Sequence, residues 1–149
     1  MVHPELAERA QCDNLALVAA FLAARGVQFV VVGGVALRLH GRDHVPADLD
    51  VVPDPSWANI RGLFDGLDAL GEVGRTWHPT DHALSTRDLV TRVTPVGSVD
   101  VLLRTGRDEH ESLERDAISI SVNRHDIRVG ALADVLRFRS RYGKGPVCA

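Results

Sequence analysis

A buried strand that ends in two glycines and precedes a pair of carboxylates constrains this chain more than any other feature. Residues 27–32 are nearly all apolar and lead directly into Gly33-Gly34. Such a run is typical of a strand that is buried on both faces of a sheet. Shortly afterwards, Asp48-Leu49-Asp50-Val51-Val52 predicts a second strand over residues 49–52. The fold has to bring acidic side chains close to a glycine-rich turn.

The two acids of the second strand share one face, because successive side chains of a strand point to opposite sides of the sheet. Asp48 and Asp50 are therefore roughly 6.5–7 Å apart along the backbone, whereas Leu49 and Val51 point into the core. Asp100 lies within an apolar strand, where an unpaired carboxylate is costly and requires a cation or hydrogen bonds. Oxygen ligands favour Mg²⁺ or Mn²⁺, and two such ions can activate a hydroxyl and neutralise a leaving pyrophosphate. We predict that Asp48, Asp50 and Asp100 are catalytic residues and metal ligands.

The glycine pair predicts a phosphate site. Gly33 and Gly34 allow backbone amides to approach a phosphate at the start of a helix, where the helix dipole favours an anion. Taken alone, such a pair is more typical of a tight turn with close helix packing, and a lone Asp-x-Asp is more typical of a solvated strand face. Their combination with a third acid on a later strand favours a site for a metal and a triphosphate.

Composition limits the class of protein. The chain has 149 residues, of which 45% are hydrophobic and 25% charged, which predicts a single domain over residues 1–149 with a substantial core. Its net charge of −3 does not attract a polyanion, so any contact with RNA has to be local. Cys12 and Cys148 lack a zinc-type spacing and predict reduced thiols. Without a long apolar run or a signal-like start, we expect a cytoplasmic protein that makes no membrane contact.

The remaining patterns predict helices that alternate with strands. We expect a first helix that stops at Gly26, a short helix over 35–40, a loop over 41–47 and a helix capped by Ser56. Further strands are expected over 89–93 and 98–103, then a hairpin with its turn at 123–126 and a helix over 131–142, whereas residues 71–86 predict a loop or an irregular strand. These elements predict an α/β (α+β) fold, a short mixed twisted sheet flanked by helices and followed by a C-terminal hairpin and helix.

Several other polar residues have a structural and a functional interpretation. The basic residues near the end of the chain fit a solvated helix face and a phosphate or RNA contact equally well; they are Arg137, Arg139, Arg141 and Lys144. His40 is expected to hold the following loop by a hydrogen bond rather than to act in catalysis. His78 and His82 have a zinc-like spacing, but Pro79 breaks the helix that such a pair needs, and we reject a zinc site.

Gly33-Gly34, Asp48-Leu49-Asp50 and Asp100 resemble the motif of the nucleotidyltransferase-fold superfamily. Within it, the run from Gly33 to His40-Gly41 is similar to the small bacterial AbiEii and MenT toxins. The resemblance implies a nucleotidyltransferase fold and the transfer of a nucleoside monophosphate from an NTP to an acceptor hydroxyl, with release of pyrophosphate. It also implies that Arg139 replaces a phosphate-binding lysine and that Lys144 lies in the same nucleotide-binding tail.

The acceptor stays open at this point. The toxin branch implies the 3′ end of tRNA as acceptor and an antitoxin protein as partner. Antibiotic nucleotidyltransferases of the aminoglycoside or lincosamide type share the three acids, and acids available to hold a cationic drug are Glu109, Glu111 and Glu114. A domain that binds a nucleotide or a partner without turnover is the third hypothesis. It is motivated by residues 44–47, His-Val-Pro-Ala, which stand where the toxin relatives carry Arg-x-Thr-x.

Overall fold

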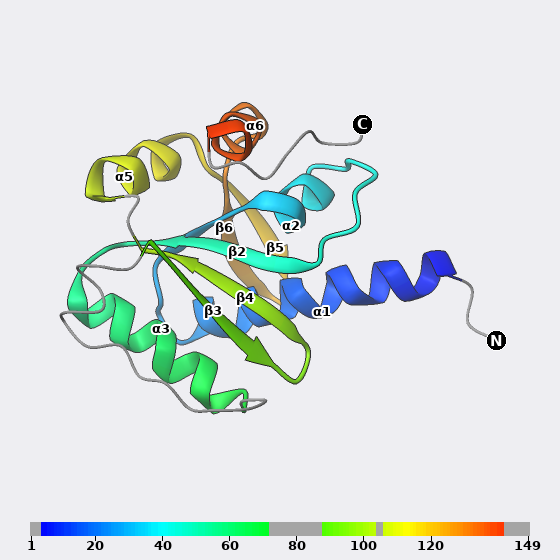
Figure 1. Ribbon diagram of the computed structural model, residues 1–149, viewed down its shortest axis with the longest axis horizontal. Coiled ribbons are helices and arrows are strands. Elements are labelled where there is room, and N and C mark those ends of the chain that lie inside the picture. Colours follow the sequence, from blue (N-terminus) through cyan, green and yellow to red (C-terminus); the bar gives the residue numbers. More distant parts are fainter. Residues whose placement is uncertain (1–3, 72–87, 104–105, 142–149) are drawn as a thin grey trace.

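A mixed six-stranded sheet forms the centre of the computed structural model, which describes residues 4–71, 88–103 and 106–141 (Figure 1). The strands lie in the order β3-β4-β2-β1-β6-β5. Their bounds are β1 (Phe29–Val32), β2 (Asp48–Pro53), β3 (Leu89–Thr94), β4 (Gly97–Leu102), β5 (Ile118–Val122) and β6 (His125–Val129). The helices are α1 (Pro4–Ala24), α2 (Gly33–Leu39), α3 (Trp57–Ala69), α5 (Gly106–Asp116) and α6 (Leu132–Arg141).

The pairing of the strands combines two hairpins with parallel neighbours. Strands β3 and β4 form one antiparallel hairpin, and β5 and β6 form the other. Strand β1 is antiparallel to β2 and parallel to β6, whereas β2 is parallel to β4. Strands β1, β2 and β4 therefore lie in the interior of the sheet, and the acid-bearing strands β2 and β4 are direct neighbours.

The two faces of the sheet are covered differently. Helices α1 and α3 pack on one face, and the main core lies there (Figure 1). Leu49 and Val51 of β2 are fully buried in this core. On the opposite face, Leu113 of α5 and Phe138 of α6 cover a smaller apolar cluster, whose strand members are Val30, Val32, Val52 and Leu102. Asp48 and Asp50 alternate with Leu49 and Val51 and therefore lie on this second face.

The expected fold class is confirmed, including the C-terminal hairpin and helix, but several boundaries were wrong. Helix α2 begins at Gly33 rather than at residue 35, because the chain turns directly from β1 into the helix. The turn of the second hairpin is shorter than residues 123–126, since strand β6 already begins at His125. Ser56 precedes α3 without a side-chain capping bond, and its amide instead donates to Asp54 Oδ1 at 2.9 Å.

Helix α5 was not predicted, and some predictions fall where the structure gives no description. Its sequence is almost entirely polar, and Leu113 is its one fully buried apolar side chain among the described positions. Most of residues 71–86 lie outside the described residues, as do His78, His82, Cys148 and Lys144. Across the described parts of the chain, no helix has the length and apolar character that crossing a membrane requires.

Candidate active site

Two buried carboxylates occupy neighbouring positions on the second face of the sheet. Asp50 of β2 lies directly opposite Asp100 of β4 in the parallel pair. The two residues are only 5% and 6% exposed. Thr91 of the adjacent strand β3 donates a hydrogen bond from Oγ1 to Asp100 Oδ1 at 2.6 Å. Paired strands are about 4.8 Å apart, so the fold holds two acidic side chains close together in an interior position.

The first acid of the motif has a different position. Asp48 lies opposite Ser98, two residues before Asp50 on the same face, and is half-buried at the start of β2. Among the residues that the structure describes, no three His, Cys, Asp or Glu side chains gather closely enough to hold a metal together. Asp50 and Asp100 are therefore direct neighbours across the strand pair, whereas Asp48 lies at the more exposed start of β2. All three acids lie on strands in the interior of the sheet.

The carboxylate of Asp50 explains why residue 33 is a glycine. Gly33 has a φ of +69°, a conformation that L side chains rarely adopt. A Cβ atom added at Gly33 would lie 2.0 Å from Asp50 Oδ2 and 2.8 Å from its Cγ. Any side chain at this position would collide with the acid, and the backbone would be strained as well. Gly33 therefore permits the close approach of Asp50, whereas its predicted contact with phosphate stays a prediction.

Gly34 is in contact with a different side chain. A Cβ at Gly34 would lie 2.9 Å from His44 Nε2 and 3.1 Å from Pro46 Cβ. His44 belongs to the loop between α2 and β2, and its ring rests against the backbone of α2. The two glycines thus separate two chemical environments, with a carboxylate beside Gly33 and an imidazole beside Gly34.

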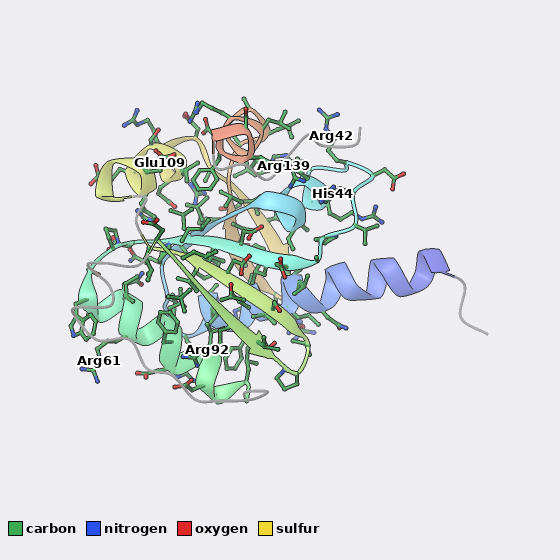
Figure 2. The ribbon with its side chains drawn as sticks, viewed as in Figure 1. Arg42, His44, Arg61, Arg92, Glu109 and Arg139 are labelled. Atoms are coloured by element: carbon green, nitrogen blue, oxygen red, sulfur yellow. The ribbon has the colours of Figure 1, made fainter. Side chains whose placement is uncertain are left out.

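A guanidinium group faces the same histidine. Figure 2 shows Arg139, from α6, and His44, from the loop, beside α2, and α6 packs against α2. Partial burial and the positive charge of Arg139 both lower the pKa of His44 from its usual value of 6.5. The next basic residue of the helix, Arg137, instead donates to Asp134 Oδ1 at 2.9 Å. Within the described part of the basic cluster, Arg139 is the member whose charge acts on His44.

The buried acids fit a divalent cation. Two carboxylates at adjacent positions repel each other when both are ionised, and a cation between them removes that cost. Mg²⁺ is usually held by one or two carboxylates together with phosphates of the substrate and water, rather than by a full set of protein ligands. Asp50 and Asp100 meet that requirement, although among the described residues no third His, Cys, Asp or Glu joins them in a metal-binding group.

Several other residues have roles away from the acids. His40 Nε2 donates to the carbonyl oxygen of Gly130 at 2.7 Å, so this bond is structural, but it ties α2 to the connection between β6 and α6 and not to the following loop as we expected. Glu114 accepts from Arg128 Nε at 2.9 Å, and both line a pocket of about 440 Å³ beside Phe29. Phe29 begins β1, whereas the acids lie near its end, so Glu114 does not extend the acidic face towards a cationic drug.

Sequence reasoning missed two residues that belong to this site. Thr91 has no distinctive motif, and only the register of the β3–β4 hairpin shows that it faces Asp100. His44 was noted only as part of a departure from a motif. The available signal was a polar side chain, capable of binding a ligand, in the segment that connects the glycine pair to the acids.

No protein-family model matches this chain, and no curated protein matches it. Among solved structures, a protein from Thermotoga maritima that is described as a "putative nucleotidyltransferase" is similar, with a TM-score of 0.60 and 15% sequence identity. The alignment covers 97% of this chain and 88% of the other. At this identity the likeness concerns the fold alone. The chain therefore has a nucleotidyltransferase-like fold, in which Asp50 lies beside both Asp100 and Gly33.

Proposed function

We propose that this protein is a metal-dependent nucleotidyltransferase that moves a nucleoside monophosphate from an NTP to an acceptor hydroxyl. The observation that carries the proposal is the pairing of Asp50 with Asp100, two nearly buried carboxylates at one register position beside Gly33. Asp50 and Asp100 would hold Mg²⁺ or Mn²⁺, with Asp48 contributing from the start of β2. The bound ion would neutralise charge that develops on the phosphates during transfer.

Other steps of the transfer are assigned to individual residues of the chain. The acceptor oxygen attacks the α-phosphorus, the bond from that phosphorus to the oxygen bridging to the β-phosphate breaks, and pyrophosphate leaves. The proton of the acceptor hydroxyl passes to Asp100, whose carboxylate is held in orientation by Thr91. Arg139 supplies positive charge for the departing pyrophosphate, and the tail that contains Lys144 is proposed to add to it.

For the acceptor, we propose the 3′ end of tRNA, with an antitoxin protein as the regulator of the enzyme. Support comes from the resemblance of the glycine and acid motifs to the toxin branch. Antibiotic transfer is less well supported, because Glu114, one of the acids considered for holding a cationic drug, is bound to Arg128 away from the paired acids. A domain that only binds nucleotide is the remaining alternative, and the following experiment separates the three.

The test uses each of the four α-labelled NTPs with Mg²⁺ and total tRNA. Asp50→Asn should lower transfer of label by at least about a hundredfold, while its circular dichroism spectrum stays that of the wild type. Asp65→Asn, which changes an exposed acid of α3, is the matched control and should leave transfer unchanged. Retained activity in Asp50→Asn would exclude the proposed chemistry. Parallel reactions offer an aminoglycoside or a lincosamide as acceptor, and label on the drug but not on tRNA would identify the antibiotic alternative. Mg²⁺-dependent NTP binding without pyrophosphate release would identify the non-catalytic one.

A further inference from the structure

The loop between α2 and β2 folds back onto the helix that precedes it. The amide of Arg42 donates to the carbonyl oxygen of Leu37 at 3.0 Å, and the amide of His44 donates to that of Arg42 at 3.0 Å. These bonds hold the loop against the end of α2. They place His44, which is half-buried, with its ring against Gly34 at the other end of the helix.

One positive group acts on this histidine from another element. The charge of Arg139 in α6 is felt by His44 (Figure 2), whereas the charge of Arg38 in α2 is paired with Asp43 at 3.5 Å. The protein as a whole carries a net charge of −3. A guanidinium group near an imidazole can hold a partner of negative charge, because both side chains donate hydrogen bonds to anions.

The different neighbours of the two glycines indicate how a bound anion would be oriented. Gly33 touches the carboxylate of Asp50, and the next residue, Gly34, touches the imidazole of His44. A ligand that spans the glycine pair would therefore meet the acids at one end and His44 with Arg139 at the other. An NTP matches this arrangement. Its α-phosphate would react beside the acids, and its β- and γ-phosphates, which carry most of the charge, would lie beside His44 and Arg139.

We propose that His44, together with Arg139, binds the β- and γ-phosphates of the NTP and the pyrophosphate that they become. The inference rests on the proposed function and names the residue that selects a triphosphate over a monophosphate at the same site. Nε2 of His44 is the ring atom that lies against Gly34, and an imidazole N–H donates well to phosphate oxygens. His44 is thus a binding residue, not one that reacts.

The lowered pKa of His44 is consistent with this role. Burial and Arg139 favour the neutral imidazole, so the histidine does not repel the arginine when no anion is present. A phosphate between the two side chains would be attracted to both. The imidazole and the guanidinium can therefore bind one anion together, and they do not repel each other when the anion is absent.

The test measures binding by calorimetry with inorganic tripolyphosphate and, separately, with nucleoside monophosphates, each in the presence of Mg²⁺. His44→Ala should weaken tripolyphosphate binding about tenfold, the effect of losing one hydrogen bond to a charged group, and should leave monophosphate binding unchanged. His44→Gln keeps an N–H donor and should recover part of the affinity. His125→Ala, which removes an exposed histidine of β6, is the matched control and should bind tripolyphosphate as the wild type does.

Two results would overturn the inference while the proposed function stands. If Asp50→Asn abolishes label transfer but His44→Ala leaves tripolyphosphate affinity unchanged, then His44 does not contact the phosphates. The same holds if His44→Ala weakens monophosphate and tripolyphosphate binding equally, because the substitution then acts on the whole site. A wild-type protein that neither transfers label nor binds tripolyphosphate would overturn the proposed function together with the inference.

Discussion

Substitution of Gly33 by alanine tests the geometry of the paired acids most directly. A φ of +69° costs about 1–2 kcal/mol for an L-residue, and the new Cβ would lie 2.0 Å from Asp50 Oδ2, where ordinary contacts begin at 3.4 Å. The carboxylate oxygen would have to retreat by the difference, about 1.4 Å, at an overpacking cost of about 1–3 kcal/mol. We expect Gly33→Ala to lower the free energy of unfolding in urea by about 2–5 kcal/mol in total. A displacement of this size should also lower transfer activity by about a hundredfold.

Gly26 provides the matched control for this prediction. It has a φ of +83°, and a Cβ added there would have no neighbour within 4 Å. Gly26→Ala should therefore show only the backbone cost of about 1–2 kcal/mol. In an Asp50→Ala background, the cost of Gly33→Ala should fall towards the same value. Equal costs for the two glycines in the wild-type background, or an unchanged cost in the Asp50→Ala background, would refute the close contact between Gly33 and the carboxylate.

Two further predictions concern stability away from the site. Arg92 is 5% exposed, pairs with Asp68 and lies 5.3 Å from the centre of the Phe64 ring, so Arg92→Ala should destabilise the fold by about 3 kcal/mol in urea unfolding. The exposed Arg61→Ala should lower stability by less than about 1 kcal/mol, and equal losses would contradict the buried role of Arg92. Arg124 lies in the β5–β6 turn at a φ of +68°, which glycine adopts without strain, so Arg124→Gly should raise stability by about 0.5–1 kcal/mol. A lower melting temperature for that variant would contradict the turn geometry.

The central strands could be predicted because their signal is local. Residues 27–32 are apolar except for Gln28, and Asp48-Leu49-Asp50-Val51 alternates with the period of a strand, so both the burial and the shared face of the acids follow from sequence. The neighbour relation between Asp50 and Asp100 does not follow, since it depends on the parallel pairing of two strands far apart in the chain. Period and composition determine which face a side chain takes, but not which strand lies beside it.

Helix α5 and the position of His44 could not be predicted from the sequence, for different reasons. Gly106–Asp116 is mostly charged, and the sheet orders it through Leu113 and through the bond from Arg128 to Glu114, which are tertiary contacts. Local patterns do not reveal a helix that is stabilised mainly by its neighbours. His44 lies in an irregular loop whose path depends on backbone bonds to α2, and no periodic pattern describes such a path.

The contacts of the glycine pair change how this motif should be tested. A glycine pair before a helix is usually explained by access of phosphate to the backbone, yet here each glycine already has a side chain in the space of its missing Cβ. Loss of activity in a Gly33 or Gly34 variant would therefore have two possible causes. Either Asp50 or His44 is displaced, or a backbone contact with phosphate is lost. Variants of the side chains themselves separate the two causes, because Asp50→Asn and His44→Gln keep the volume of the site. If the glycines serve mainly to admit these side chains, then Gly34→Ala should be tolerated better when residue 44 is alanine than when it is histidine, and the two substitutions should be strongly non-additive.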